Sequence, residues 1–500
     1  MATSKWLKLP HPRPPPTDHP VLSLLSQAPQ QEHLRALHAR AVTSGLIADT
    51  FAASRLVQHF LPLDLRYAES VFDSLHHPDA YTWNAMIAGH ISHSSPPRRC
   101  VSFYFRMRAA APRAPPNSHS FALLLKSCIA SADKQQAATA RLVHGQVLKC
   151  GFEDDIIIKN SLMRMYINMG LLAPDARSLF DASVFLDAVS WNTMVSAYGK
   201  SGNMATAREL FDRMPERTLV SWSTLLDGYL GAGDSAEALR VFRGMREDGV
   251  RPDSVALVSA LKACARSGAL EDGRAIRRYI DDRSDLGIGR NVVLATALVD
   301  MYCKCGCIDE AAEVFSSVGD GDVVLWNAMV GGLAMHGDSK RALEHFEMMK
   351  RRGVAPNGST YVGVLCACTH AGMLDEGIEL FESMREHGIE PDRNHYGCLA
   401  DLMGRAGRVR DAERVLLTMP MEPEATQWGA LMSACLAVKD VEVGERVGKR
   451  LIELEPYDGG RRISLANLYA AVGRYDEARE LRRGMEEMGV RKETGTSITV

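Results

Sequence analysis

The 500-residue sequence has no long hydrophobic run and no excess of charge of one sign. Its longest apolar stretches, such as 156–158 and 361–366, are far shorter than the roughly 18 residues that a membrane-spanning helix requires. We therefore expect no membrane segment. The 58 Lys and Arg residues nearly balance 61 Asp and Glu, so no global field attracts nucleic acid or lipid, although one groove could still be basic. Since 46% of the residues are apolar, the chain has enough of them to fold around a large core.

The sequence also lacks common motifs for phosphate binding, ester hydrolysis and structural zinc. It contains no G-x-x-x-x-G-K-[ST] phosphate loop and no G-x-S-x-G nucleophile elbow. The eleven cysteines include no C-x-x-C pair, and Cys303, Cys305 and Cys307 stand two apart, a spacing that does not match ordinary zinc sites. We interpret the cysteines as small buried residues in a reducing compartment, and we expect neither a metal nor a cofactor.

The first seventeen residues have a composition of their own. They contain Lys5, Lys8 and Arg13, five prolines and no acidic residue, and they lack the apolar region of a secretory signal. This bias is typical of an organellar transit segment, and a disordered proline-rich tail would share it. We predict that residues 1–19 form such a segment, with the mitochondrion favoured over the chloroplast.

Glycine recurs along the chain at a nearly constant spacing. A chain of this length forms about three ordinary domains or one long repeat array. The recurring glycines are Gly170, Gly202, Gly233, Gly268, Gly306, Gly337, Gly372, Gly407 and Gly473. Successive gaps fall near 31 and near 35 residues, and the last gap of 66 equals about two periods. The spacing indicates a repeat array.

Each repeat has the apolar pattern of two helices. A first helix, as in 191–198, stops at its glycine, and a second, as in 207–214, ends at a proline or a Gly-x-x-Pro turn. Because one such hairpin cannot bury its apolar face alone, neighbouring hairpins must stack. The sequence therefore predicts an all-α solenoid with 30–38 residues per repeat. Tryptophan marks about every third repeat, at positions 83, 191, 222, 326 and 428, so repeats of three lengths alternate.

Several phrases resemble those of plant pentatricopeptide-repeat proteins. They are Val-Ser-Trp-Asn-Thr-Met (189–194), Gly-Val-Arg-Pro-Asp (249–253) and Leu-Val-Asp-Met-Tyr-Cys-Lys-Cys-Gly (298–306). The alternating repeat lengths resemble the PLS subclass, and the resemblance covers about residues 20–500. It implies a right-handed superhelix of hairpins that binds single-stranded RNA, with one base read per repeat. We expect about 12 repeats over residues 20–424.

The resemblance also implies which residues read the bases. They are the fifth and the last residue of each repeat, and apolar residues flanking them are expected to sandwich the base. The seven matching pairs are Ser54 with Asp79, Asn84 with Asn117, Asn160 with Asp187, Asn192 with Thr218, Ser223 with Asp253, Thr296 with Asp322, and Asn327 with Asn357. In the family's code, Ser or Thr with Asp favours guanine, Asn with Asp favours uracil, and Asn with Asn or Thr favours a pyrimidine.

Four repeats depart from this code. Ala122, Val258 and Val362 occupy the fifth position in three long repeats, and the repeat 393–424 has Gly397 with Glu424. An alkyl side chain forms no hydrogen bond with a base, so we expect these repeats to space the others rather than to read. The alternative for any single pair is a helix cap or a turn residue, a role that Asp, Asn and Ser often fill. Because seven such pairs occur in register, we favour base reading over helix capping.

The C-terminal part, residues 425–500, resembles the family's E-type motifs. The phrases 427–435 and 467–475 match two such motifs, and 493–497 resembles their end, although Thr494 stands where proline is usual. The resemblance implies a role in organellar C-to-U editing, and the chain stops where related proteins continue into a DYW deaminase domain. His345 and Glu347 match the H-x-E of a deaminase, but the P-C-x-x-C that would supply zinc ligands is missing.

We therefore predict a protein that is not itself an enzyme. It would recognise one site in single-stranded organellar RNA and recruit a DYW-type deaminase in trans, with accessory editing factors as further partners. Two alternatives stay open. One is RNA stabilisation or splicing without editing, and the other is a protein scaffold of the tetratricopeptide type, whose unit is about 34 residues long.

Overall fold

The structure is a computed structural model that describes residues 31–110, 114–130, 137–283, 286–287, 289, 291–319 and 321–487. Throughout these ranges every regular element is a helix, which confirms the predicted all-α class. No helix within them is both long and apolar enough to cross a membrane. The predicted transit segment lies outside the described residues.

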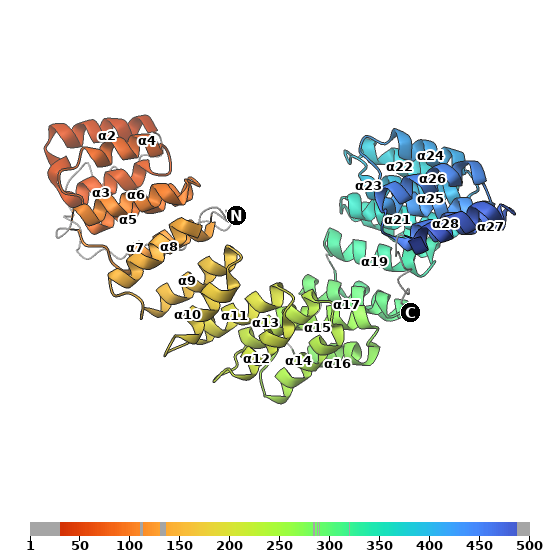
Figure 1. Ribbon diagram of the computed structural model, residues 1–500, viewed down its shortest axis with the longest axis horizontal. Coiled ribbons are helices and arrows are strands. Elements are labelled where there is room, and N and C mark those ends of the chain that lie inside the picture. Colours follow the sequence, from red (N-terminus) through yellow and green to blue (C-terminus); the bar gives the residue numbers. More distant parts are fainter. Residues whose placement is uncertain are drawn as a thin grey trace. The chain divides into compact units, whose positions relative to one another are not determined.

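The chain divides into two compact units, and the first is Met1–Gly228. Its helices follow one another as pairs joined by short loops (Figure 1). They are α2 (Gln31–Thr43), α3 (Thr50–Phe60), α4 (Leu65–Asp73), α5 (Ala80–Ser92), α6 (Pro97–Ala109), α7 (Ser118–Ala130), α8 (Ala137–Lys149), α9 (Ile156–Asn168), α10 (Arg177–Asp181), α11 (Ala188–Lys200) and α12 (Met204–Asp212). Two shorter elements are the 3-10 turn η1 (Leu46–Ala48) and the π-helical turn η3 (Leu172–Ala176), which leads into α10. Helix α13 (Leu219–Gly231) ends the unit and enters the next.

The second compact unit, Tyr229–Val500, repeats the same pairing. Its helices are α14 (Ser235–Glu247), α15 (Ser254–Ser267), α16 (Leu270–Asp281), α17 (Val292–Lys304), α18 (Ile308–Ser317), α19 (Val323–Met335), α20 (Ser339–Arg351), α21 (Gly358–Ala371), α22 (Leu374–Glu386), α23 (Arg393–Arg405), α24 (Val409–Thr418), α25 (Ala425–Val438), α26 (Val441–Leu454), α27 (Gly459–Ala471) and α28 (Tyr475–Glu487). The hairpin pattern that the sequence predicts is therefore present in both units.

A polar side chain starts the first helix of most repeats. The last residue of one repeat caps the helix that opens the next, because its side-chain oxygen accepts backbone N–H groups that the first turn leaves unpaired. Asp187 Oδ1 accepts from Ser190 N at 2.8 Å, and Asp322 Oδ1 accepts from Leu325 N at 3.0 Å. The repeat boundaries are thus set locally by these caps.

A residue in the left-handed conformation, in all but one case glycine, follows the first helix of the repeats from residue 156 onward. The nine recurring glycines all have positive φ, from 67° at Gly268 to 86° at Gly473, a conformation that costs glycine no steric strain. The gap of 66 residues contains one further position of this kind. Lys439, at the end of α25, has φ 59° although it is not glycine. The periodicity therefore continues unbroken through residues 407–473.

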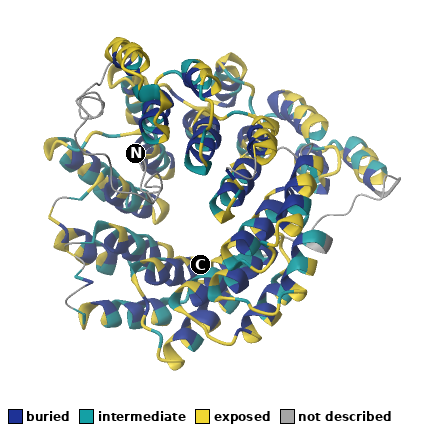
Figure 2. Cartoon of the chain, turned by 90° about the vertical axis from the view of Figure 1, so that its left-hand side faces the viewer, coloured by how far each residue is buried: buried dark blue, intermediate teal, exposed yellow. Residues whose placement is uncertain are grey.

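Aromatic rings connect successive repeats. In four places a tryptophan of a first helix packs edge-on against a phenylalanine of the preceding second helix, with ring centroids 4.6 to 4.8 Å apart. The pairs are Phe72 with Trp83, Phe180 with Trp191, Phe211 with Trp222, and Phe315 with Trp326. Figure 2 shows that buried residues gather on the sides of helices that face one another, and that exposed residues lie on the outer sides. The recurring tryptophans are thus part of the core.

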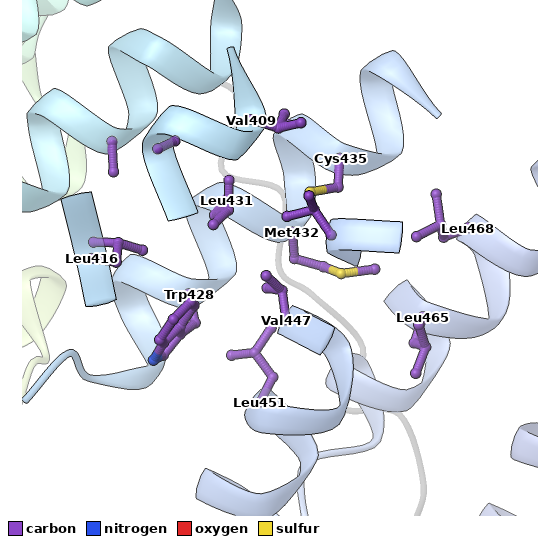
Figure 3. Packing of buried hydrophobic residues seen from close by; sticks show 14 of the residues in the cluster. Val409, Leu416, Trp428, Leu431, Met432, Cys435, Val447, Leu451, Leu465 and Leu468 are labelled. Carbon is purple, nitrogen blue, oxygen red and sulfur yellow. The ribbon is translucent and has the colours of Figure 1, made fainter. Parts of the chain in front are cut away.

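The helices α23 to α28 share one apolar cluster. Figure 3 shows Trp428 and Leu431 of α25 between Leu416 of α24 and Val447 of α26, and Cys435 of α25 belongs to the same cluster. Leu431 and Cys435 are fully buried. Truncating Leu431 to alanine would cost about 2–5 kcal/mol, as is usual for a buried leucine. This C-terminal part therefore has a buried apolar core like the repeats before it.

Candidate functional site

An exposed apolar residue stands at the second position of six consecutive repeats. Between 54% and 67% of each of these residues is exposed to solvent. They are Ile157, Val189, Val220, Val255, Val293 and Val324. Phe51, Tyr81 and His119 hold this position in the three repeats before them, and Ser359, Asn394 and Thr426 hold it in the three after. Within each compact unit these exposed β-branched residues contribute little to the core, and they recur at the same position of successive repeats.

The structure joins three of the seven predicted pairs by a direct hydrogen bond. Asn84 Nδ2 donates to Asn117 Oδ1 at 3.3 Å, and Asn160 Nδ2 donates to Asp187 Oδ1 at 3.1 Å. In the third pair Asn327 Nδ2 donates to Asn357 Oδ1 at 3.0 Å. The fifth residues are buried or half-buried, whereas the last residues are exposed. Residues about 30 positions apart thus present one polar surface per repeat.

Two hydroxyl pairs are arranged differently. Ser54 Oγ donates to Phe51 O and Thr296 Oγ1 donates to Val292 O, each at 2.8 Å within its own helix. Among the described residues no hydrogen bond joins Ser54 to Asp79 or Thr296 to Asp322. Because the hydroxyl proton is donated to a backbone carbonyl, each of these two oxygens can only accept a further hydrogen bond in this arrangement.

The residues of the last two pairs have other surroundings. Asn192 Oδ1 is buried without a hydrogen-bond partner among the described residues, while Thr218 Oγ1 lies 3.1 Å from Ser221 Oγ. Ser223 and Asp253 belong to different compact units, so each is described alone. Ser223 is half-buried on α13, and Asp253 caps α15 through Ala256 N at 2.9 Å.

The last residues cap helices as well as forming these pairs. Asp187 Oδ1 accepts from the backbone N–H of Ser190 and from Asn160 Nδ2, and Ser190 Oγ lies 2.8 Å from it. Burial alone would raise the pKa of Asp187, but these hydrogen bonds outweigh it and lower the pKa below its ordinary value. Asp187 is therefore ionised at neutral pH, and it accepts hydrogen bonds only. The same atom, Asp187 Oδ1, thus serves as the helix cap and is the atom predicted to read the base.

One groove in the first compact unit contains both kinds of position. It has a volume of about 640 Å³ and lies along α9 and α11. Val189 and Val220, the second residues of adjacent repeats, line it together with the predicted reader Asn192. Arg164 and Lys200, both exposed, add positive charge. An apolar pair, an amide and two cations are the groups that a nucleotide needs for its base face, base edge and phosphate.

Residues that resemble metal or deaminase motifs are part of the packing. No group of three or more His, Cys, Asp and Glu that could hold a metal occurs in the described part of the chain. His345 packs edge-on against Phe315, and its Nδ1 lies 2.8 Å from Arg341 O. Cys303 is buried, and burial raises the pKa of its thiol to about 12.

Known proteins share this organisation. Models of the PPR repeat, the PPR repeat family and the pentatricopeptide repeat domain match residues 189–219, 217–266, 293–319, 321–370 and 349–406. A pentatricopeptide repeat-containing protein of Arabidopsis thaliana is 42% identical over 486 residues, which cover 95% of this chain and 76% of that protein. The chain belongs to the pentatricopeptide repeat family. An E-motif model also matches residues 438–499.

Further pentatricopeptide repeat proteins are similar over the same length. A second Arabidopsis thaliana member is 38% identical over 481 residues, covering 95% of this chain and 89% of its own. Among solved structures, the pentatricopeptide repeat protein PPR10 in complex with an 18-nucleotide psaJ RNA element has a TM-score of 0.60 at 18% identity. That match covers 95% of this chain and 74% of PPR10. It shows that the two proteins share the solenoid fold.

Several residues of the surface were missed by sequence reasoning. The second-position row is visible in the sequence as a branched aliphatic residue one place after each of six first helices begins. Arg164 and Lys200 gave no such signal, because exposed cations are common on helices. Their place in the groove follows only from the structure.

Proposed function

We propose that this protein binds single-stranded RNA in a sequence-specific way, with one base at each reading repeat. The observation that carries the proposal is the row of exposed apolar residues beside the polar pairs. Stacking a base on an apolar side chain is insensitive to sequence, whereas hydrogen bonds to its edge discriminate between bases. The solenoid that this chain shares with the RNA-bound PPR10 supports the proposal.

Each part of the groove around Asn192 would take a different part of a nucleotide. Val189 and Val220 would hold the two faces of the base, and Asn192 would meet its edge. Arg164 and Lys200 would approach the phosphate, where cations add affinity without specificity. Because phosphate contacts release counterions, affinity should fall as salt concentration rises.

The residue pairs predict an order of bases in the bound RNA. With the N-terminus toward the 5′ end and starting at repeat 50–79, the order is G, pyrimidine, any, U, pyrimidine, G, any, G, pyrimidine, any, any. Selection from a random RNA pool with the full chain tests it. Recovery of this order supports base reading in this register. A pool of bound RNAs unrelated to the order contradicts the reading positions, and failure to bind single-stranded RNA contradicts the proposed function itself.

We infer further that the protein acts as a site-recognition factor for organellar C-to-U RNA editing. The E-motif match at residues 438–499 supports this role. The edited cytidine would lie a few bases 3′ of the bound segment, and a DYW-type deaminase would be recruited in trans with accessory factors. The basic, proline-rich N-terminus supports import into an organelle, the mitochondrion being favoured, while two similar Arabidopsis thaliana proteins are named as chloroplastic.

The editing role is tested by sequencing organellar RNA from a plant that lacks the protein. The expected result is the loss of conversion at one cytidine downstream of a segment with the proposed order. Adding purified protein and a DYW-type deaminase to that transcript should restore conversion, whereas either protein alone should not. Unchanged editing at every site in the mutant plant would contradict the role.

A further inference from the structure

The third residue of a repeat lies beside the reading pair of the repeat before it. Ser190 Oγ is 2.6 Å from Asn160 Oδ1 and 2.8 Å from Asp187 Oδ1. Thr360 Oγ1 is 2.6 Å from Asn327 Oδ1. Both hydroxyl residues are fully buried, with an exposed fraction of 0%. A buried hydroxyl therefore contacts the amide oxygen of the reader in two repeats.

The chemistry of the partners fixes which end of the Asn160 amide faces which group. Asp187 is a carboxylate that only accepts hydrogen bonds, so the nitrogen of Asn160 must face it. The amide oxygen of Asn160 then faces Ser190, which has to be the donor. With its oxygen occupied, Asn160 has only its second N–H left for a base.

The same reasoning holds for the repeat 323–357. The backbone N–H of Thr360 donates to Asn357 Oδ1 at 3.2 Å, so that atom is an oxygen. Asn327 must therefore direct its nitrogen toward Asn357 and its oxygen toward the Thr360 hydroxyl. Both amides of this pair are left with N–H groups.

Two other repeats lack this contact although they also have a hydroxyl at the third position. Ser120 Oγ contacts Asn117 Oδ1 at 3.1 Å, and Ser221 Oγ contacts Thr218 Oγ1 at 3.1 Å. The amide oxygens of Asn84 and Asn192 are buried and have no hydrogen-bond partner in the described part of the chain. The presence of the contact thus divides the four asparagine readers into two classes.

We propose that Ser190 and Thr360 are positioning residues that determine base specificity in the preceding repeat. By occupying the amide oxygen of the reader, each hydroxyl holds the amide nitrogen toward the base. Asn160 then offers a donor beside the acceptor Asp187, which matches the carbonyl and N3–H of uracil. Asn327 and Asn357 offer two donors, which match N3 and O2 of cytosine. This inference rests on the proposed RNA-binding function.

Removal of the hydroxyl tests the proposal in the full-length chain. The variant Ser190→Ala leaves a buried acceptor unpaired, a state that rotation of the Asn160 side chain relieves. Competition binding would use four RNAs of the proposed order that differ only at the base opposite repeat 156–187. Loss of one hydrogen bond should reduce the preference for U by about 2- to 12-fold. Ser190→Thr, which keeps the hydroxyl, should retain the preference.

A second pair of variants tests the same idea in the other compact unit. Thr360→Val keeps the shape of the side chain and removes the hydroxyl, and Thr360→Ser keeps the hydroxyl. We expect the preference for C opposite repeat 323–357 to fall in the first variant only. The base opposite repeat 292–322 is the internal control, because the following repeat has the apolar Leu325 at its third position. Its preference should not change in either variant.

A further test compares base discrimination at different repeats of the wild-type protein. Discrimination should be stronger opposite repeats 156–187 and 323–357 than opposite 80–117 and 188–218, whose readers lack the contact. The positioning role is overturned if Ser190→Ala and Thr360→Val keep the full base preference of the wild type. If the wild type itself shows no preference at these bases, the proposed reading function fails, and the inference fails with it.

Discussion

The repeats from residue 156 to 357 and the helices from Gly358 onward differ in the residues at the second and fifth positions. In the former, the second residue is an exposed aliphatic side chain such as Val324, and five of the six fifth residues are asparagine or hydroxyl residues of the predicted reading pairs. After Gly358 the second residues are Ser359, Asn394 and Thr426, and the fifth residues are Val362, Gly397 and Gly429. The residue types at the second position and at the fifth position therefore change at the same point of the chain.

The packing of these two regions is alike. Arginines link successive second helices to acidic residues in both regions, as in Arg274 with Glu310 at 2.8 Å and Arg446 with Glu413 at 2.7 Å. Such exposed ion pairs contribute little stability, and they face away from the core. Gly332 in α19 and Gly444 in α26 both lie where an added Cβ would come within 2.3 Å of a neighbouring side chain. The difference at the second and fifth positions is therefore a difference of the surface and not of the core packing.

Replacing the exposed valines should have the largest effect on binding. We expect the triple variant Val255→Ser, Val293→Ser and Val324→Ser to bind RNA of the proposed order about 100-fold more weakly, at about 1 kcal/mol per stacked base. Filter binding measures the change. Because the three side chains are exposed, the melting temperature should change little.

A matched control comes from the second region. Ser359→Ala, Asn394→Ala and Thr426→Ala alter the same position in the next three repeats. We expect this triple variant to bind RNA within about threefold of the wild type, since each side chain is polar and offers little area for stacking. A loss similar to that of the valine variant would mean that base stacking continues beyond residue 358, and the contrast between the regions would be wrong.

A smaller effect is expected from a change of one reading atom. Asp322 Oδ1 caps α19 by accepting from Val324 N and Leu325 N. In Asp322→Asn the amide adds a donor, so the repeat 292–322 should shift from G toward A by at least about fivefold. Competition between two RNAs that differ at this base measures the shift.

The same substitution separates reading from capping. Asparagine caps a helix about as well as aspartate, so the melting temperature should stay nearly constant. If Asp322 acts as a cap only, the ratio of G to A binding would be unchanged as well. That outcome would remove Asp322 from the reading surface.

The hairpins could be predicted from the sequence because each repeat carries local signals. A polar cap starts the first helix and a left-handed glycine ends it, and both act within a few residues. Lys439 was not found because its positive φ occurs in a residue type that seldom adopts it. The family resemblance supplied the reading pairs, and the structure brings three of the seven into direct contact.

The atoms around the readers could not be predicted. Ser190 and Ser221 stand at the same position of successive repeats, yet only Ser190 contacts the amide oxygen of a preceding asparagine. The partner of Ser221 is Thr218, whereas the corresponding residue before Ser190 is Asp187. A hydroxyl at the third position therefore does not by itself indicate which oxygen it contacts.

The smallest effect is expected from pH. The pKa of Asp187 lies below its ordinary value because Ser190 and Asn160 donate to its carboxylate against the opposing effect of burial. A carboxylate of this kind stabilises the folded state above its unfolded pKa of about 3.9, and the contribution is lost only as pH falls through the lower folded pKa. Between about pH 5.5 and pH 8 Asp187 therefore stays ionised, and the preference for U opposite repeat 156–187 should change by less than about twofold. Competition binding across this range measures it. A preference that disappears near pH 6 would show that the carboxylate gains a proton there, and Asp187 could not be the acceptor for the N3–H of uracil.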